Sequence, residues 1–476
     1  MKLDNNFFQN IFKSAEVFWG LNNHIDSFDF ILKDKEILVS IDSRTVTSQD
    51  IFLAMTGPNF DGHNFLINAL EKGILGLIIE KNKKHLLQNI PANLLDQKLI
   101  IIVDDTYKTL IEMAKYWRNR FDIPVVGVTG SIGKTTTKEM LASILNAAQI
   151  PHLVSYKNQN NQIGLPLNIL RLKKEDKIAV FELGINDTGE MDFLVDIVQP
   201  TIAVITTVGH VHIEGLGSLE GVSLEKRRIF KNFLSKNVGI IFGDNPLLGD
   251  VLYSHPIVKF GFKKDNNVIG HDIKILHHED NSFVEFILKI YGQSQKVKLY
   301  IDNEILVHNA LAAVSVAHVL GIDLNYIVKG LENFRPISGR FEKKPLNNNK
   351  GFLINDCYNA GPESMKASIL AFDKMVGKGI KIAVLGDMLE LGEMEAFWHK
   401  HIGEVLNSTS DIKELILVGE RSKLILETLS RNIKVNWVEN WQQALELLQQ
   451  TLVDNSLILL KASHGMGFSN LVDKLS

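Results

Sequence analysis

The sequence has little cysteine, no long apolar run and no excess of charge of one sign. Cys357 is the single cysteine among 476 residues, so neither an internal disulfide nor a cysteine-based zinc site can form. The longest apolar runs, such as residues 99–103, have the length of a strand, whereas a transmembrane helix needs about 20 apolar residues. Residues 1–20 mix charged side chains with apolar ones, so we expect no signal peptide.

The charges nearly cancel. Lysine and arginine number 51 and aspartate and glutamate 55, which leaves a net charge of −4. This balance gives no basic field that would recruit nucleic acid. We therefore expect a cytoplasmic globular protein without membrane insertion and without a nucleic-acid partner.

Short apolar runs alternate with helical patterns along the chain. Uninterrupted apolar strands that alternate with helices are typical of parallel sheets covered by helices on both faces. The sequence therefore predicts an α/β fold, and an alternating pattern within residues 263–298 predicts a β-hairpin insertion. The runs predicted as strands are 76–79, 99–103, 125–128, 178–181, 202–205, 352–355, 380–385, 414–418 and 456–460.

The length of the chain predicts about three domains. A first break is expected near residue 105, where a helical pattern over 106–120 leads into the strand at 125–128. A second break is expected at 334–339, where proline and glycine follow another helical segment. The predicted domains are therefore 1–104, 105–334 and 335–476.

A glycine-rich turn follows the strand at 125–128. It reads Gly130-Ser131-Ile-Gly133-Lys134-Thr135, and a helical pattern over 138–147 follows it. Glycines let backbone N–H groups close on phosphate oxygens, and the start of a helix adds a partial positive charge. Lys134 would meet the outer phosphates, and the Thr135 hydroxyl would coordinate Mg²⁺. The turn predicts nucleotide binding, but it leaves a motor, a switch GTPase, a kinase and a ligase open.

Further motifs follow one another along the whole chain. They are Asp42-Ser43-Arg44, Phe60-Asp61-Gly62-His63, the asparagine-rich stretch at 158–167, Glu182-Leu-Gly184, His212-Ile-Glu214-Gly215 with Lys226, Asn309-Ala-Leu-Ala-Ala313, Ser338-Gly-Arg340-Phe-Glu342, Asn355-Asp356-Cys-Tyr358-Asn359 and Gly386-Asp387-Met388-Leu-Glu390-Leu-Gly392. Together with the glycine-rich turn, their order and spacing resemble the Mur ligases of peptidoglycan synthesis. The resemblance is strongest to the member that adds the terminal D-alanyl-D-alanine dipeptide.

The resemblance implies an architecture and a reaction. A central P-loop ATPase domain would stand between an N-terminal domain that binds the UDP-MurNAc-peptide and a Rossmann-like C-terminal domain that binds D-Ala-D-Ala. The enzyme would join D-Ala-D-Ala to UDP-N-acetylmuramoyl-tripeptide through an acyl phosphate, giving the UDP-MurNAc-pentapeptide, ADP and phosphate. The implied cofactors are ATP and two Mg²⁺ ions, the partners are these small-molecule substrates, and we expect a monomer. The third residue of the tripeptide, diaminopimelate or lysine, stays open.

The resemblance also assigns roles to residues. The implied catalytic residues are Lys134, Glu182, His212 and Lys226. The metal ligands would be Thr135, Glu182, His212 and, if carbamylated, Lys226. The residues that would bind ATP are Gly130, Ser131, Gly133, Lys134, Thr135, Thr136, Asn309, Arg340, Asp356, Tyr358 and Asn359. The residues that would bind the UDP-linked substrate are Ser43, Arg44, His63, Asn158 and Asn161.

One of these residues has another interpretation from the sequence alone. Lys226 stands in the charged run Glu225-Lys-Arg-Arg228, which by itself predicts a solvated helix face.

Arg340 and Asp356 come from the third domain, so they can reach a nucleotide on the central domain only after domain closure, which would also exclude water. Cys357 has no partner histidine pattern and is expected to be a packing residue.

Three alternatives remain at this point. The sister ligase that adds the third amino acid typically carries Asp-Asn-Pro-Arg where this chain has Gly386-Asp-Met-Leu-Glu-Leu-Gly392. Folylpolyglutamate synthase is a further relative, disfavoured by Asp42-Ser43-Arg44. A nucleotide-dependent regulatory switch without ligase activity is the third, and the absence of a guanine-reading Asn-Lys-x-Asp counts against a GTPase.

Overall fold

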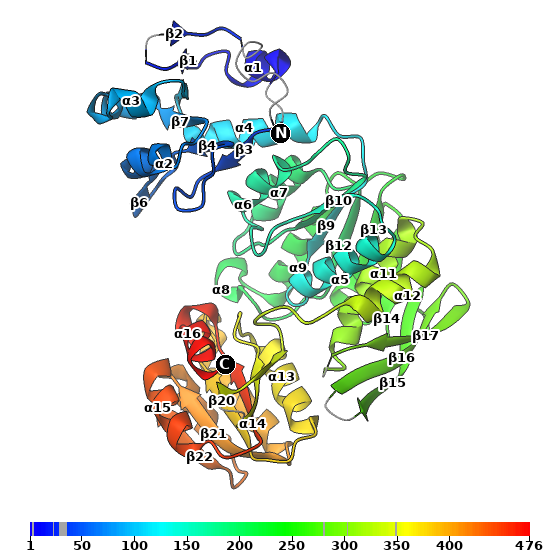
Figure 1. Ribbon diagram of the computed structural model, residues 1–476. Coiled ribbons are helices and arrows are strands. Elements are labelled where there is room, and N and C mark those ends of the chain that lie inside the picture. Colours follow the sequence, from blue (N-terminus) through cyan, green and yellow to red (C-terminus); the bar gives the residue numbers. More distant parts are fainter. Residues whose placement is uncertain (2–3, 22, 28–35, 279–280, 302, 348–349) are drawn as a thin grey trace. The chain divides into compact units, whose positions relative to one another are not determined.

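The computed structural model of the chain describes residues 1, 4–21, 23–27, 36–278, 281–301, 303–347 and 350–476 (Figure 1). By their contacts these residues form two units. The first consists of Met1–Val125, Pro151–Leu183 and Asp192–Pro200, and the second of Val126–Ile150, Gly184–Met191 and Thr201–Ser476. The units divide the chain by contact rather than by function, so the domain boundaries expected from the sequence stay predictions.

The first unit contains a sheet in the order β2-β1-β8-β7-β4-β3. The strands β3, β4, β7 and β8 are parallel, and β1 pairs antiparallel with β8. Every residue of β8 is buried, as its uninterrupted apolar run predicts. The elements are α1 (Asn5–Ile11), β1 (Glu16–Trp19), β2 (Asn23–His24), β3 (Leu38–Ser40), β4 (Asp50–Leu53), β5 (Thr56–Gly57), β6 (Phe60–Asp61), α2 (Leu66–Glu71), β7 (Gly76–Glu80), α3 (Ala92–Leu95) and β8 (Leu99–Val103).

The rest of the first unit is organised around a long helix, α4 (Thr106–Arg118), which packs against α6 (Gly164–Ile169). Trp117 donates a hydrogen bond to the carbonyl of Leu172 over 3.1 Å. The buried guanidinium of Arg118 donates to the carbonyl of Val198 over 2.9 Å. The strands β10 (His152–Val154) and β11 (Ile178–Glu182) pair in parallel, and most of α7 (Glu190–Val198) belongs to the same unit.

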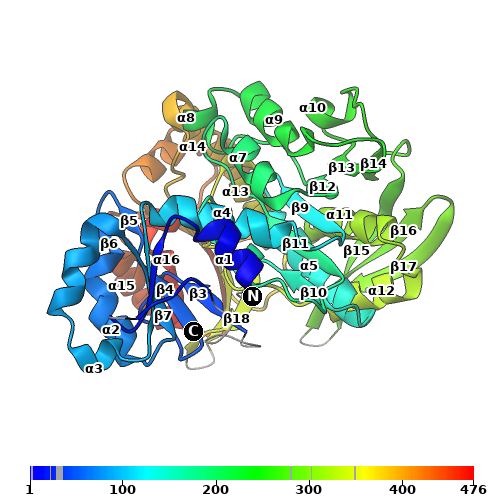
Figure 2. The ribbon, with the colours of Figure 1, turned by 90° about the horizontal axis from the view of Figure 1, so that it is seen from above.

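The second unit begins with a parallel sheet that continues into an antiparallel ribbon, in the order β9-β12-β13-β14-β15-β16-β17. The ribbon confirms the expected hairpin within 263–298 and adds a third strand; residues 279 and 280 lie outside the described part. Figure 2 shows α11 and α12 beside this ribbon, where α11 contacts β15 and α12 contacts β17. The elements are β9 (Val125–Thr129), α5 (Lys134–Ala147), β12 (Ile202–Ile205), α8 (Ile213–Leu216), α9 (Leu219–Arg227), β13 (Val238–Phe242), α10 (Pro246–Gly249), β14 (Ile257–Gly261), β15 (Val268–His278), β16 (Asn281–Ile290), β17 (Gln293–Leu299), α11 (Leu306–Val319) and α12 (Leu324–Asn333).

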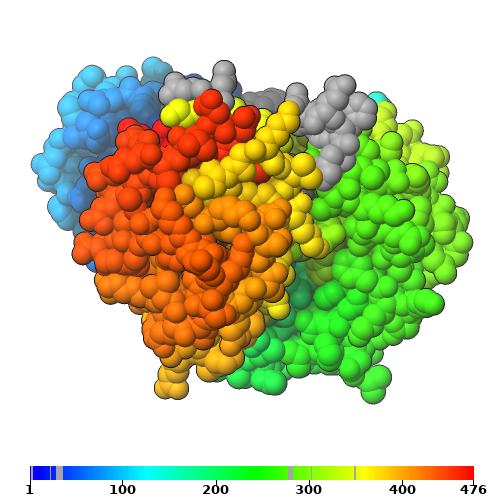
Figure 3. All heavy atoms as spheres, turned by 90° about the horizontal axis from the view of Figure 1, so that it is seen from below, coloured from blue at the N-terminus to red at the C-terminus, as the bar shows by residue number. Residues whose placement is uncertain are grey.

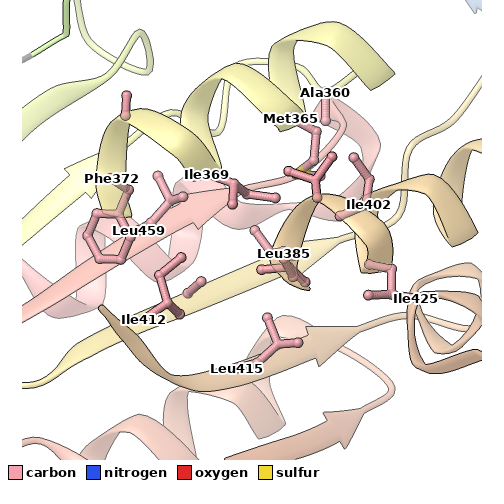
Figure 4. Packing of buried hydrophobic residues seen from close by; sticks show 14 of the residues in the cluster. Ala360, Met365, Ile369, Phe372, Leu385, Ile402, Ile412, Leu415, Ile425 and Leu459 are labelled. Atoms are coloured by element: carbon pink, nitrogen blue, oxygen red, sulfur yellow. The ribbon is translucent and has the colours of Figure 1, made fainter. Parts of the chain in front are cut away.

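The C-terminal part of the second unit holds its own sheet, in the order β18-β19-β23-β20-β21-β22. All pairs are parallel except that of the edge strand β18. Apolar residues of α13 and α14 cover one face, among them Met365, Ile369 and Ile402 (Figure 4), and α15 and α16 contribute to a second cluster. The elements are β18 (Glu342–Pro345), β19 (Gly351–Asn355), α13 (Pro362–Lys374), β20 (Lys381–Gly386), α14 (Glu395–Asn407), β21 (Ile412–Val418), β22 (Lys434–Val438), α15 (Trp441–Thr451), β23 (Ser456–Lys461) and α16 (Phe468–Leu475).

The fold agrees with two expectations from the sequence, the α/β class and the packing role of Cys357. The parallel sheets with helices confirm the α/β class, and Cys357 is buried in the cluster that α15 and α16 help to form. In the described part of the chain, no helix combines the length and the apolar character needed to cross a membrane.

Candidate functional site

The glycine-rich turn between β9 and α5 is closely packed on both sides. Gly130 and Gly133 have φ of 146° and 86°, which L side chains rarely adopt. A Cβ on Gly133 would lie 2.1 Å from the side-chain oxygen of Asn309, and one on Gly130 would lie 1.9 Å from the hydroxyl of Thr206. Both positions therefore require glycine, and the predicted residue Asn309 lies directly against the turn.

The segment that follows β12 forms hydrogen bonds that hold this turn, and His308 of α11 contacts the same segment. The Ser131 N–H donates to the Thr207 carbonyl over 2.9 Å, and the Gly209 N–H donates to the Ser131 hydroxyl over 2.8 Å. The Thr206 hydroxyl donates to the Ile132 carbonyl over 2.5 Å. His308 contacts the Thr206 carbonyl through Nε2 at 2.8 Å, and burial lowers the pKa of His308 to about 4. The residues that support the turn have no local sequence signal and were not predicted as site residues. They are Thr206, Thr207, Gly209 and His308.

Lys134 and the start of α5 suit an anion. The Lys134 ammonium reaches across the turn and donates to the Gly130 carbonyl over 2.8 Å. Gly133 occupies the N-cap position of this 14-residue helix and has no side chain that could cap it. Backbone N–H groups and the helix dipole favour negative charge at such an end. The turn, whose neighbour Thr136 is buried, therefore fits the phosphates of a nucleotide.

Lys226 is buried on α9, with only 1% of its surface exposed. Its neighbour Glu225 accepts hydrogen bonds from the N–H groups of Gly189 (2.9 Å) and Met191 (3.0 Å), so this side of the helix faces the interior. Burial and the nearby charge of Lys134 lower the pKa of Lys226 well below its ordinary value. The solvated helix face that the charge run predicts is therefore wrong for this residue.

His212 joins Lys134 and Lys226 to form one cluster. Burial and the positive charges of these two lysines lower the pKa of His212, and the nearby Glu390 opposes that shift. Nδ1 of His212 lies 2.7 Å from Oε2 of Glu390. Three of the four predicted catalytic residues thus lie close enough to influence one another's charge. Glu390 was not predicted as a site residue.

Arg340 reaches the glycine-rich turn from the C-terminal part of the same unit. Its Nη2 donates to the Thr135 hydroxyl over 3.3 Å, and its guanidinium lies 3.8 Å from the centroid of the Tyr358 ring. Such stacking fixes a guanidinium in place. The structure therefore brings the predicted residues Arg340 and Thr135 together, although 205 residues separate them in the sequence. The predicted residue Tyr358 lies beside Arg340.

Asp356 is buried and held by the residues around it. Its carboxylate accepts a hydrogen bond from the Phe341 N–H over 3.1 Å and another from the Ser368 hydroxyl. The Lys461 ammonium lies 2.7 Å from the same carboxylate and also donates to the carbonyl of Asn359 over 3.0 Å. Lys461 thus joins the predicted Asp356 and Asn359, a connection that the sequence did not indicate.

Glu182 and the predicted asparagines lie in the first unit. Glu182 is buried at the end of β11 and accepts a hydrogen bond from the Asn160 amide over 2.9 Å. The side-chain oxygen of Asn161 accepts from the Gly164 N–H at the start of α6 over 2.8 Å, whereas Asn158 is exposed. Asn160, which was not predicted as a site residue, therefore contacts the predicted residue Glu182.

The three predicted residues of the N-terminal part differ in how they are held. Ser43 is buried, whereas the exposed Arg44 binds the Asp42 carboxylate through Nε (2.9 Å) and Nη2 (2.8 Å). His63 is buried, and both of its ring nitrogens have partners.

The partners of His63 fix its tautomer. Nδ1 lies 2.7 Å from the Asp61 carboxylate, and Nε2 accepts from the Glu80 N–H over 3.0 Å. Burial raises the pKa of Asp61, but hydrogen bonds from Lys83 and His63 outweigh it and lower that pKa to about 2. His63 therefore anchors this part of the fold through a fixed Nδ1–H tautomer.

The predicted metal ligands suit an ion that shares its coordination with a substrate. Within the residues that the structure describes, no three His, Cys, Asp or Glu side chains gather closely enough to hold a metal ion by themselves. Mg²⁺ usually takes one or two carboxylates together with phosphates and waters rather than a cage made only of protein. By its donor chemistry, each of the predicted ligands can take part in coordination of that kind: Glu182 in the first unit, and Thr135 and His212 in the second.

Known proteins are similar to this chain over most of its length. Three domain families match the chain: the Mur ligase family catalytic domain over residues 38–118, the Mur ligase middle domain over 128–317 and the Mur ligase glutamate ligase domain over 339–464. A relative from Bacillus subtilis (strain 168), named UDP-N-acetylmuramoyl-tripeptide--D-alanyl-D-alanine ligase, is 34% identical over 92% of each chain.

The chain belongs to the Mur ligase family. Solved Mur ligases share its architecture. The crystal structure of MurF from Acinetobacter baumannii is 31% identical, covers 92% of this chain and 93% of its own, and has a TM-score of 0.78. That of MurF ligase from Thermotoga maritima in complex with ADP is 28% identical, covers 92% and 96%, and has a TM-score of 0.76. The expected three-domain Mur ligase architecture is thereby confirmed.

Proposed function

We propose that this Mur ligase uses ATP to join D-alanyl-D-alanine to UDP-N-acetylmuramoyl-tripeptide, giving the UDP-MurNAc-pentapeptide. The relative from Bacillus subtilis supports this substrate pair, because the likeness extends over 92% of both chains. The structural observation that supports the use of ATP is the contact between Arg340 and Thr135, because it brings a cation of the C-terminal part to the glycine-rich turn. We propose that the enzyme acts in the cytoplasm, where ATP is available, and that it is a monomer.

The reaction requires activation of a carboxylate. In the first step a carboxylate oxygen of the tripeptide attacks the γ-phosphorus of ATP, and ADP leaves. In the second the amine of D-Ala-D-Ala attacks the acyl carbon, and phosphate leaves with the bonding electrons of the C–O bond while the amine loses a proton. The first step brings two anions together, so positive groups that face the transferring phosphoryl group supply most of the stabilisation.

The residues around the glycine-rich turn supply that charge. Lys134 reaches over the turn, and Arg340, which stacks on Tyr358, reaches the Thr135 hydroxyl. Backbone N–H groups of Gly130, Gly133 and Thr136 bind the phosphates. Ser131, whose own N–H donates to the Thr207 carbonyl, supports the turn together with Asn309. Asp356 and Asn359 contact the rest of the nucleotide.

Two Mg²⁺ ions would supply further positive charge between the phosphates and the tripeptide carboxylate. Thr135 and Glu182 would hold the first ion, and His212 would hold the second. Lys226 would supply an anionic ligand as its carbamate, because a neutral amine adds to CO₂ whereas an ammonium does not. The buried position of Lys226 and its strongly lowered pKa favour the neutral amine.

The carbamate can be tested by chemical rescue. Lys226→Ala should lose activity, and a short carboxylate such as acetate should restore part of it, whereas the matched variant Lys231→Ala on the same segment should need no rescue. A carbamate carbon labelled with ¹³CO₂ should also give an NMR signal that the Lys226→Ala variant lacks. Full activity of this variant without added carboxylate would contradict the carbamate.

The UDP-linked substrate is bound by Ser43, Arg44, His63, Asn158 and Asn161. Arg44 supplies the positive charge for the diphosphate, and His63 acts by holding its loop through Asp61 and Glu80.

The function itself can be tested by mass spectrometry with a panel of UDP-linked acceptors and amine donors. We expect a product only with a tripeptide acceptor and D-Ala-D-Ala, together with phosphate release that depends on both. A product from a UDP-linked dipeptide and a single amino acid would favour the sister ligase that adds the third residue. Phosphate release without either substrate would favour a nucleotide-dependent switch.

A further inference from the structure

The loop that carries His212 meets the C-terminal part of its unit through two histidine–glutamate contacts. His212 Nδ1 lies 2.7 Å from Glu390 Oε2, across 178 residues of sequence. His210 Nδ1 lies 2.6 Å from Glu363 Oε1, across 153 residues. Figure 3 shows the C-terminal segment, coloured yellow to red, against the green segment of the same unit. Only His212 is a proposed metal ligand, so the two contacts form a natural pair for comparison.

The contact with Glu390 determines how the His212 ring can bind a metal. An ionised carboxylate only accepts hydrogen bonds, so Nδ1 must carry the proton. The same tautomer places the lone pair on Nε2, the atom that the ring can then offer to a metal. Histidine ligands of metals almost always donate their other N–H to a carboxylate, carbonyl or water, which fixes the ring and raises its basicity.

Both partners are held in an unusual backbone conformation. His212 has φ of 56° and Glu390 has φ of 62°, in the left-handed region that non-glycine residues rarely adopt. Such conformations persist where the surrounding structure over-determines them, and they cluster at functional sites. Gly392, with φ of 53°, brings the Glu390 turn close to Glu214, so that a Cβ on Gly392 would lie 3.6 Å from the Glu214 Cα.

The charges around His212 give Glu390 a second effect. Lys134 places positive charge close to the ring. The negative charge of the Glu390 carboxylate lies beside Nδ1 of His212, and this charge favours a cation bound to the other ring nitrogen, Nε2. In contrast, Oε1 of Glu363 contacts Nδ1 of the His210 ring and also accepts a hydrogen bond from the His210 backbone N–H over 2.9 Å.

We propose that Glu390 is a positioning residue for the second metal ion. Its carboxylate, supplied by the C-terminal part of the chain, fixes the tautomer and the orientation of His212. Metal binding at His212 is thereby coupled to docking of the C-terminal turn, and by linkage each favours the other. This inference rests on the proposed role of His212 as a metal ligand.

Binding of Mn²⁺ in the presence of ADP, followed by electron paramagnetic resonance, tests the inference without relying on activity. Glu390→Gln keeps a hydrogen-bond acceptor but loses the charge, and it should weaken the second Mn²⁺ site about 10- to 100-fold. Glu390→Asp keeps the charge with a shorter reach and should show a smaller loss. The matched variant Glu363→Gln should leave this site within about twofold, because Glu363 binds a histidine that is not a ligand. Thermal melting shows whether each variant is folded.

The outcomes separate the inference from the proposed function on which it rests. If His212→Ala leaves Mn²⁺ binding unchanged, His212 is no ligand and the proposed role itself is wrong. If His212→Ala abolishes the second site but Glu390→Gln leaves it intact, only the role of Glu390 is overturned. Equal losses in Glu390→Gln and Glu363→Gln would also overturn it, because both contacts would then act only by docking the two segments.

Discussion

Two arginines that we propose to meet phosphate groups are held in opposite ways. Arg340 stacks on Tyr358 and reaches Thr135, which lies 205 residues away in sequence. Arg44 is exposed and is held by Asp42, two residues away. The second unit therefore builds its site from long-range contacts, whereas the N-terminal site relies on a local turn. Long-range contacts preorganise a charge for the chemical step. The local contact with Asp42 leaves the charge of Arg44 exposed to solvent.

The largest effect is expected at Lys134, inside the long-range site. Lys134→Ala should lower kcat at least about 1,000-fold, or about 4 kcal/mol, because it removes the ammonium that reaches across the turn to the Gly130 carbonyl. Steady-state kinetics of phosphate release would measure it, with the exposed Lys329→Ala as the control. A loss smaller than about tenfold would show that this charge is not needed in the transition state.

Arg340 tests whether its geometry matters beyond its charge. Arg340→Lys keeps the charge but removes the fork and the stacking on Tyr358, so kcat/KM for ATP should fall about 10- to 100-fold. Arg335→Lys is a matched control, since Arg335 also lies over a tyrosine, Tyr300, at 4.8 Å. Equal values for the two variants would mean that Arg340 contributes only through its charge or not at all.

Arg44 should show the milder behaviour of the local site. Arg44→Ala should raise KM for the UDP-linked tripeptide about three- to tenfold and leave kcat nearly unchanged, because an exposed cation contributes similarly to the ground and transition states. The effect should shrink as salt is added. Arg120→Ala, which removes an arginine paired with Asp4 in the same unit, should leave KM unchanged. A large fall in kcat would place Arg44 with the long-range site instead.

The smallest effect concerns stability of the N-terminal part. Asp61 has a pKa of about 2 in the folded chain against an ordinary 3.8, so it adds stability above pH 4 that is lost as the pH falls toward about 2. Asp61→Asn should cost about 1 kcal/mol at pH 7, since the group is partly exposed and screened. Urea denaturation of both proteins at several pH values would measure the difference. It should narrow as the pH is lowered, and a constant difference would show that charge is not the cause.

The same contrast explains what could be predicted from the sequence. The apolar runs at 99–103 and 202–205 match β8 and β12 residue for residue, because full burial leaves a plain signal. Helix α5 begins at Lys134 rather than at 138, since the left-handed Gly133 lets the chain turn directly into the helix.

The contacts that complete the site have no such signal. Lys226 sits in a charged run, yet its helix turns it inward, where Glu225 binds the backbone at 189 and 191. The support that Thr206 and His308 give to the turn depends on how β12 and α11 pack, which no local pattern records. The family resemblance indicated Lys226 and His212, but Glu390 emerged only from the structure.

The single cysteine has a practical consequence for experiments on motion. Cys357 is buried, and burial and the nearby Asp356 raise its pKa to about 11, so it stays a poorly reactive thiol near neutral pH. A cysteine introduced at an exposed position, such as Leu252 or Val376, would therefore accept a spin or fluorescent label almost alone. The chain thus offers a nearly silent background for measuring distances between labelled sites as substrates bind.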